Sequence, residues 1–531
     1  MRLGLACLAV SALVVAAVWA WLGQPIAMPN APLAAGEKLY CVSYAPFRDG
    51  QTPFDPNMRV SPQQIDDDLT RLAKIADCVR TYSVELGQDQ VAAIAKRHGL
   101  KVVQGIWLGV NPLKNRSEIE TAVSIANQYP DVIRAVVVGN EVLLRGDLAA
   151  DDLVADIREV KSRVKVPVTY ADVWEYWLKN PQVGAATDFV TIHILPYWED
   201  FPIDAARAAA HVDVIRQRVV TALAGKDVII GEVGWPSEGR MREGALPSPA
   251  NQARVIQDVL AMAKKGDYRV NVIEAFDQPW KRGLEGTVGG FWGLLDAHTR
   301  EYKFAWGQPV SNHPQWKFQA AGGVAAVIMI FAAAFAARRS AVPLRAWLAV
   351  TANAIAGGLL IGWSVADIVP QSYDPGGWVK CSALAALALL TPPVLSAAAV
   401  RGTAVPAFFR VIGPPAEGTR DPLALAAGAL LIAAMLLALQ SALGLVFDPR
   451  YRDFPFAPLT AAAVPFVAHY LTVKRPAGVR LSAETASAAL LALSVPYIAI
   501  NESFANWQSL WLCVAFAALA FILAQARDAQ S

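Results

Sequence analysis

The first part of the chain repeats short hydrophobic runs, each followed by a more polar stretch. The runs are rich in β-branched residues and alternate little, which is typical of strands buried on both faces of a parallel sheet. They predict eight strands, at 38–44, 77–82, 100–107, 132–139, 166–171, 188–194, 227–233 and 270–276. Helical patterns fill most connections, at 63–76, 87–98, 116–128, 149–162, 204–223 and 250–264. The fifth connection, around 173–181, is the shortest.

This repeat predicts an α/β fold of the closed (β/α)8 type. Eight strand–helix units in roughly 280 residues have the length and order of a TIM barrel. A doubly wound open sheet is the alternative, but no G-x-G-x-x-G motif follows the first strand. We therefore expect a barrel ectodomain over residues 31–315.

Long apolar runs lie before and after this segment. Residues 3–22 follow Arg2 and have about the 20 residues needed to cross a bilayer. An uncleaved signal anchor over 1–30 is favoured over a cleaved signal peptide, because the run is long and lacks a clear A-x-A site. Residues 316–531 are expected to form an all-α multi-pass membrane domain of about seven helices. The predicted spans lie near 319–336, 343–365, 378–399, 423–446, 456–473, 484–500 and 507–526.

The distribution of charge supports this division and predicts an orientation. Of 47 Lys and Arg and 45 Asp and Glu residues, only 22 follow Lys317. Basic residues in short loops mark the cytoplasmic side. With Arg2 inside, the inner loops also hold Arg338, Arg339, Arg345, Arg401, Arg410, Arg420, Lys474, Arg475, Arg480 and Arg527. The outer loops hold Lys380, Arg450 and Arg452. Both termini are therefore expected in the cytoplasm, with residues 23–318 outside the inner membrane.

Net charge and cysteine content exclude some functions. A formal net charge of +2 without a basic stripe gives no case for nucleic acid binding. The five cysteines form neither a CxxC pair nor a Cys/His cluster, so a structural zinc site is not expected. Cys41 and Cys78 lie on consecutive predicted strands, which leaves a disulfide and two buried thiols as alternatives.

In a (β/α)8 barrel, active-site groups project from the carboxyl ends of the strands. Glu141 ends the fourth predicted strand and Glu232 the seventh. One glutamate at a strand end is usually a solvated charge, but two, each behind a hydrophobic strand and near aromatic residues, indicate chemistry. Carboxylates about 5–5.5 Å apart permit double-displacement glycoside hydrolysis, one as acid/base and one as nucleophile. The other strand-end side chains are Tyr44, Arg80, Tyr82, Trp107, Asn140, Asp172, His193, Tyr197, Glu274 and Asp277.

Aromatic side chains near the strand ends are candidates for stacking on sugar rings. For each of them, packing in the core is the alternative. The tryptophans concerned are Trp107, Trp174, Trp177, Trp198, Trp235, Trp280 and Trp292.

Two motifs resemble glycoside hydrolase family seventeen, the β-1,3-glucanases and glucanosyltransferases. They are Gly139-Asn140-Glu141-Val142 and Gly231-Glu232-Val233-Gly234-Trp235-Pro236-Ser237. The stretch from Glu274 to Lys281, with Glu285 and Phe291-Trp292-Gly293-Leu294, looks like the eighth-strand region of that family. The resemblance covers about 38–308. It departs at Gln278, where many relatives have glutamate.

The resemblance implies roles for individual residues. Glu141 is expected to be the acid/base, with its pKa held up by burial and by the opposing carboxylate. Glu232 is expected to be the ionised nucleophile, accepting hydrogen bonds from neighbours such as Tyr197. Asn140 is expected to bond the sugar 2-hydroxyl. The remaining candidate substrate-binding residues are Tyr44, Tyr82, Trp107, Asp172, His193, Tyr197, Trp235, Glu274, Trp280, Lys281 and Glu285. No metal or other cofactor is expected, and Asp66, Asp67 and Asp68 are interpreted as a solvated helix start.

The function favoured on this basis is a retaining hydrolase or transglycosylase that remodels or builds periplasmic β-1,3/β-1,6-glucans from a bacterial inner membrane. Its expected partners are β-glucan and membrane lipid, and a glucan synthase or exporter is a further candidate. The longest inner loop, about 400–422, has only Glu417 and Asp421 as acidic residues, too few for a nucleotide-sugar transferase. Two alternatives stay open, a simple endo- or exo-β-1,3-glucanase and a non-catalytic glucan-binding sensor or export accessory.

Overall fold

The computed structural model describes residues 2–339, 341–413, 421–474 and 478–528. Two compact units divide the chain. One consists of Ile26–Glu238 and Gly244–Val310. The other consists of Met1–Pro25, Gly239–Glu243 and Ser311–Ser531. Of the basic and acidic loop residues used above, Arg420, Arg475 and Glu417 lie outside the described residues.

The first unit contains a closed barrel of eight parallel strands in sequential order, as predicted. β1 pairs with both β2 and β8, which closes the sheet. Nearly every strand residue is buried, which explains the unalternating hydrophobic runs. The strands are β1 (Cys41–Ser43), β2 (Cys78–Arg80), β3 (Lys101–Ile106), β4 (Ile133–Asn140), β5 (Val168–Val173), β6 (Val190–His193), β7 (Val228–Val233) and β8 (Val270–Val272).

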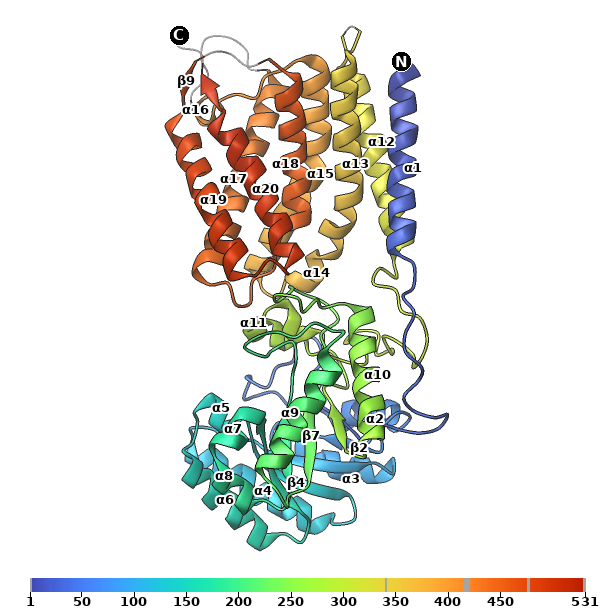
Figure 1. Ribbon diagram of the computed structural model, residues 1–531, viewed down its shortest axis with the longest axis vertical. Coiled ribbons are helices and arrows are strands. Elements are labelled where there is room, and N and C mark those ends of the chain that lie inside the picture. The colour runs from blue at the N-terminus through green and yellow to red at the C-terminus, as the bar shows by residue number, and fades with distance from the viewer. Residues whose placement is uncertain (1, 340, 414–420, 475–477, 529–531) are drawn as a thin grey trace. The chain divides into compact units, whose positions relative to one another are not determined.

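Helices occupy the connections between the strands (Figure 1). The larger ones are α2 (Pro62–Leu72), α3 (Val91–Arg97), α4 (Pro112–Gln128), α6 (Ala150–Arg163), α9 (Ala208–Ala222) and α10 (Pro249–Lys265). The short fifth connection holds α7 (Trp174–Lys179) and α8 (Pro181–Ala186). Capping defines the helix starts: Asn111 accepts from two amides of α4, and Ser248 accepts from Asn251 in α10. Single turns, α5 (Val142–Arg145) and α11 (Arg282–Glu285), follow β4 and β8.

Cys41 and Cys78 form a disulfide between β1 and β2. Their Cα atoms are 4.4 Å apart, and both side chains are buried. This decides between the two alternatives that the sequence leaves open for these cysteines.

The acidic run in α2 differs from its predicted role. The helix begins at Pro62 behind the capping residue Ser61, so the run lies in its middle. Asp68 is fully buried, accepts from Arg48 at 3.1 Å and pairs with Arg300. The interpretation as a solvated helix start is therefore wrong for Asp68, because this side of α2 faces the barrel.

The second unit is a bundle of apolar helices. They are α1 (Arg2–Leu22), α12 (Trp316–Ala337), α13 (Leu344–Ala366), α15 (Pro375–Arg401), α17 (Pro422–Phe447), α18 (Phe456–Thr472), α19 (Ser482–Asn501) and α20 (Trp507–Ala524). Among the described residues, seven helices are long and apolar enough to cross a membrane, whereas α18 has 17 residues and is shorter. Glycines bring α12 and α13 close together, since a Cβ on Gly323 would lie 2.3 Å from the Gly358 carbonyl oxygen. An Asn353–Ser396 hydrogen bond of 2.9 Å joins α13 to α15.

Candidate active site

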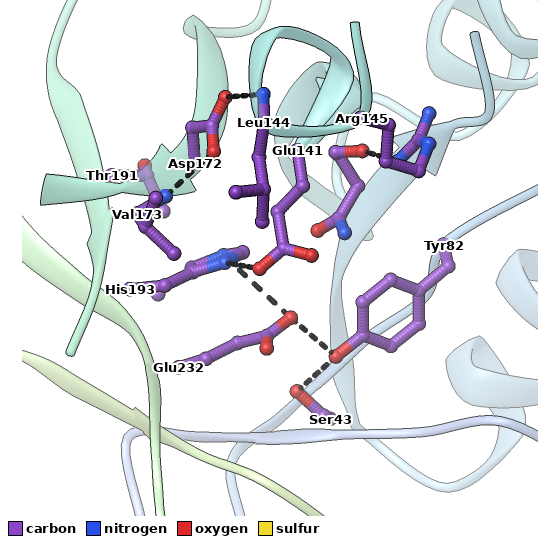
Figure 2. Close-up of polar contacts among 12 residues, drawn as sticks. Ser43, Tyr82, Glu141, Leu144, Arg145, Asp172, Val173, Thr191, His193 and Glu232 are labelled. Atoms are coloured by element: carbon purple, nitrogen blue, oxygen red, sulfur yellow. Dashed lines mark hydrogen bonds and ion pairs between the residues drawn. The ribbon is translucent and has the colours of Figure 1, made fainter. Parts of the chain in front are cut away.

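The two predicted carboxylates meet at the carboxyl end of the barrel. Glu232 lies within β7, and Glu141 directly follows β4. Ligand atoms of Glu141, Glu232 and His193, one from each residue, all lie within 4.8 Å of one another. Figure 2 shows the two carboxylates with the His193 ring beside them. This proximity matches the arrangement of retaining glycosidases, whose carboxyl groups are about 5–5.5 Å apart.

A sharp turn at the end of β4 places Glu141. Gly139 has a φ of +88° and Glu141 a φ of +53°, so the chain leaves the strand through left-handed conformations. The amides that begin α5 find acceptors on β5. Leu143 N donates to the Tyr170 hydroxyl at 3.0 Å, and Leu144 N donates to Asp172 Oδ2 at 3.3 Å. The turn that carries Glu141 is thus fastened to the neighbouring strand.

Asp172 therefore supports the site from within the protein. It is fully buried, and besides Leu144 it accepts from the Tyr170 hydroxyl and, at 2.7 Å, from Val173 N. Burial raises the pKa of Asp172 to about 6, while the Tyr170 hydrogen bond opposes the shift. Its expected contact with substrate stays a prediction, and the geometry supports a positioning role.

Glu232 is held by a cation and a phenol. Arg80 Nη1 donates to Glu232 Oε1 at 3.0 Å, and the Tyr82 hydroxyl lies 2.8 Å from the same oxygen. The Tyr82 hydroxyl also lies 2.9 Å from Ser43 Oγ. Burial and the neighbouring Glu232 raise the pKa of Tyr82 well above its usual value, so the phenol keeps its proton as a donor. The hydrogen bond expected from Tyr197 to Glu232 stays a prediction.

Arg80 links the strands that carry Glu141 and Glu232. In the sequence it lies at a predicted strand end, but no specific role was assigned to it. It is 2% exposed, and its Nη1 also donates to the Gly231 carbonyl at 2.8 Å. Its Nη2 donates to Asn140 Oδ1 at 2.6 Å. A signal was present, because an arginine that ends a three-residue strand of otherwise uncharged residues needs a buried acidic or carbonyl partner.

His193 bridges the carboxylates and changes the expected ionisation of Glu141. The ring is fully buried, with Nδ1 2.7 Å from Glu141 Oε1 and Nε2 3.6 Å from Glu232 Oε1. Burial raises the pKa of Glu141, but the His193 hydrogen bond and the charges of His193, Arg80 and Arg145 outweigh it. The pKa of Glu141 is therefore lowered, and the expectation that it is held up is wrong for the free protein.

Glu274, Lys281 and Glu285 form a second group of charged residues that interacts with Glu141 and Glu232. Lys281 Nζ donates to Glu274 Oε1 at 2.8 Å. Burial raises the pKa of Glu274 to about 7, although the Lys281 charge opposes this. Burial also raises the pKa of Glu285, and the charges of Glu141 and Glu232 add to the rise. The charges of Glu141 and Glu232 thus act on Glu285, and the expected contact of Glu285 with substrate stays a prediction.

The structure separates the aromatic candidates. Trp235 is fully buried and donates to the Leu246 carbonyl at 3.0 Å, so its expected sugar contact is wrong and it packs in the core. Tyr44 is likewise buried, with its hydroxyl 3.1 Å from Asp68 Oδ2. Trp107 is 42% exposed, with the Arg145 guanidinium 4.3 Å from its ring centroid. Trp177 and Trp292 are also buried, whereas Trp174, Trp198 and Trp280 are half-buried.

Glu141, His193 and Glu232 carry ligand types that some metal ions accept. Arg80 lies in the same space, with Nη1 3.0 Å from Glu232 Oε1 and 3.2 Å from His193 Nε2. A guanidinium donates and cannot act as a metal ligand. Its positive charge stands beside the oxygen and nitrogen that an ion would need, so these residues do not fit a metal.

Glu118 is a further buried acid that sequence reasoning missed. Its Oε2 accepts from the amides of Val84 and Trp107, both at 3.2 Å, and its Oε1 accepts from the Ser83 hydroxyl. The carboxylate thereby joins the segments that follow β2 and β3, close to Tyr82. Burial raises the pKa of Glu118 to about 7, against the three hydrogen bonds.

The Glu118→Gln variant is expected to flatten the pH dependence of stability. The pKa of Glu118 is higher in the folded protein than in the unfolded chain, so the wild type loses stability as pH rises from about 4.5 to 7. The variant lacks this loss. At pH 8 its free energy of unfolding should therefore exceed that of the wild type by up to about 3 kcal/mol. Glutamine can still accept from the two amides and donate to Ser83. Urea midpoints of the barrel in the full chain, measured by pulse proteolysis at pH 5 and pH 8, test this.

The exposed Glu301 provides the control, since its side chain is 74% exposed. Glu301→Gln should keep the wild-type difference between the two pH values. An equal difference in Glu118→Gln and wild type would contradict the assigned shift.

Comparison with known proteins shows what the barrel is similar to. Residues 41–293 match the family model described as the BtgE/BtgC glycoside hydrolase domain. Glucan 1,3-beta-glucosidase BGL2 of Candida albicans is 28% identical over 254 residues, covering 43% of this chain and 81% of that protein. The probable family 17 glucosidase SCW10 of Saccharomyces cerevisiae is 28% identical over 265 residues, covering 48% and 64%. A solved β-1,3-glucanosyltransferase of Rhizomucor miehei, an active-site mutant with laminaritriose, is 27% identical, covers 50% of this chain and 95% of its own, and has a TM-score of 0.45. Over residues 41–293 the chain is therefore similar to the BtgE/BtgC glycoside hydrolases, and the resemblance of its motifs to glycoside hydrolase family seventeen is confirmed.

Proposed function

We propose that the barrel cleaves β-1,3-glucan by a retaining mechanism, with Glu232 as nucleophile and Glu141 as acid/base. The observation that carries this proposal is the approach of their carboxylate oxygens to within 4.8 Å. The unequal surroundings of the two groups support the roles. Glu232 is 6% exposed and paired with Arg80, whereas Glu141 is 23% exposed. The names of the relatives, glucan 1,3-beta-glucosidases among them, support β-1,3-glucan as the substrate class.

In the first step, a Glu232 oxygen bonds to the anomeric carbon while the bond to the leaving oxygen breaks. Protonated Glu141 gives its proton to that oxygen. Arg80 and Tyr82 both bind Glu232 Oε1, and no contact described for this residue involves Oε2, which is left to attack. Because Arg80 holds Asn140 Oδ1, the Asn140 amide nitrogen can donate to the sugar 2-hydroxyl.

In the second step, a hydroxyl group opens the glycosyl-enzyme and gives its proton to ionised Glu141. The acceptor is water in hydrolysis and a sugar hydroxyl in transfer. We propose transfer, with β-1,6 branches among its products, so that the protein builds or remodels β-1,3/β-1,6-glucan. The exposed Trp107 is a candidate acceptor platform.

Product analysis tests this function. The full chain in detergent would be incubated with β-1,3-gluco-oligosaccharides, and the products resolved by mass and linkage. Products longer than the donor support transfer, and shorter products alone, even at high donor concentration, support a simple glucanase. Binding without any conversion would point to a glucan-binding sensor or export accessory.

We further propose that the helical unit anchors the protein in a bacterial inner membrane, with the barrel in the periplasm. In the described part of the chain, seven helices of sufficient length and hydropathy support a membrane location. The excess of basic residues in alternate loops supports the orientation. In this arrangement lipid surrounds the helices, and the bundle could also bind a glucan synthase or exporter.

Reporter fusions test the orientation. A reporter active only outside the cytoplasm should give a signal after Pro314 and none after Ser531, because an odd number of spans separates the two points. This requires α18 to cross the membrane although it has only 17 residues. Equal signals at both positions would contradict the eight-span arrangement.

A further inference from the structure

His193 is placed to act on both catalytic carboxylates at once. It ends β6, between the strands that carry Glu141 and Glu232, and its side chain is fully buried. Nδ1 lies 2.7 Å from Glu141 Oε1, and Nε2 lies 3.6 Å from Glu232 Oε1. In Figure 2 the ring lies against the Glu141 carboxylate.

The contact with Glu141 fixes the direction of one hydrogen bond. An ionised carboxylate can only accept, so His193 Nδ1 carries a proton and donates it to Glu141 Oε1, 2.7 Å away. On the other side of the ring, Nε2 lies 3.2 Å from Arg80 Nη1.

We infer that His193 is a positioning residue that anchors the acid/base carboxylate and stabilises its ionised form, which sets the alkaline limit for cleaving unactivated glucan. This rests on the proposed role of Glu141. The lowered pKa of Glu141 agrees with it, since after burial the His193 hydrogen bond has the largest influence. The ionised form is the one that accepts a proton from the incoming hydroxyl, so the same contact prepares the second step.

Other charges around the pair act on the same equilibrium. Arg80 from β2 and Arg145 from α5 favour ionised Glu141. Asp172 from β5 interacts with both Glu141 and His193. Two further carboxylates face the same group. Glu232 of β7 lies 3.6 Å from His193 Nε2. The charge of Glu141 raises the pKa of Glu285 of α11. Because the His193 variants retain all of these groups, a change in the titration of Glu141 is assigned to the lost contact.

The test compares His193→Ala and His193→Asn in the full chain in detergent. The asparagine amide nitrogen can take the place of Nδ1 and keep a donor, whereas alanine cannot. We expect the alkaline limb of kcat/KM for laminaripentaose to move up by about one pH unit in His193→Ala. His193→Asn should stay near wild type. The limb should not move with 2,4-dinitrophenyl β-laminaribioside, whose leaving group needs no acid.

A control and a measurement independent of turnover complete the test. His98→Asn removes another histidine that contacts a carboxylate, Asp66 at 2.9 Å, and should change nothing at the site. The pH dependence of carbodiimide labelling of Glu141, followed by peptide mass spectrometry, should shift as the kinetic limb does. His193→Gln, whose amide replaces Nε2 rather than Nδ1, substitutes for the alanine variant if that variant does not fold.

The outcomes separate the inference from the proposed function. If the pH dependence of Glu141 labelling is the same in the wild type and in His193→Ala or His193→Gln, the inference is wrong, even if turnover falls in the variant. Shifted labelling without glucan turnover in the wild type would support the inference on the titration and reject the proposed reaction.

Discussion

Replacing Glu232 by glutamine is expected to lower turnover of β-1,3-gluco-oligosaccharides by at least about 10^4-fold. The glutamine oxygen can still accept from Arg80 and Tyr82, whose donors lie 3.0 and 2.8 Å from Oε1 in the wild type. The variant should therefore fold, yet an amide cannot form the glycosyl-enzyme. Steady-state rates on laminaripentaose, with circular dichroism as the check on folding, measure the effect.

The matched control is Glu301→Gln, which makes the same chemical change on a side chain that is 74% exposed. It should keep wild-type rates. A Glu232→Gln variant with more than a few per cent of wild-type turnover would transfer the nucleophile role to another carboxylate. Glu274 would then be the first candidate, because it is buried beside Lys281, whose Nζ lies 2.8 Å from its Oε1.

The barrel could be predicted because strand and helix periods alternate with little ambiguity. Boundaries were less certain where the local signal is weak. β5 ends at Val173, two residues beyond its predicted end. α7 begins at the next residue, Trp174, so no loop residues mark the boundary in the sequence. Asp68 was misplaced for a similar reason. An acidic triplet shows no sign that one member turns inward to meet Arg48 and Arg300, which are distant in sequence.

The proximity of Glu141 and Glu232 could be predicted from the sequence, because each glutamate ends a strand and the strand ends of a barrel lie together. The ionisation of Glu141 could not be predicted, since it depends on which side chains reach it from other strands. Burial alone would raise the pKa of Glu141, but the His193 hydrogen bond and the neighbouring positive charges reverse the sign. The orientation of Trp235 could not be predicted either. Its closeness to Glu232 in the sequence gives no sign that the ring is buried in the core.

The Glu141→Ala variant should separate the two steps of the reaction. Without the acid, laminaripentaose should turn over at least about 10^2-fold more slowly, the typical contribution of general acid catalysis. The first step with 2,4-dinitrophenyl β-laminaribioside should be largely spared, because dinitrophenolate leaves without protonation. The glycosyl-enzyme should then accumulate, since no base activates the incoming hydroxyl, and a burst of dinitrophenolate should precede slow turnover.

Azide supplies the decisive observation for this variant. The anion needs no general base, and loss of the Glu141 side chain removes a carboxylate that lies within 4.8 Å of Glu232. Azide should therefore speed turnover of the aryl substrate and yield a β-glycosyl azide, the configuration that results from two inversions at the anomeric carbon. Glu232→Gln should show neither the burst nor this product. A β-glycosyl azide from Glu232→Gln, together with an α-glycosyl azide from Glu141→Ala, would reassign the two roles, because azide gives the α product only where it replaces the nucleophile itself.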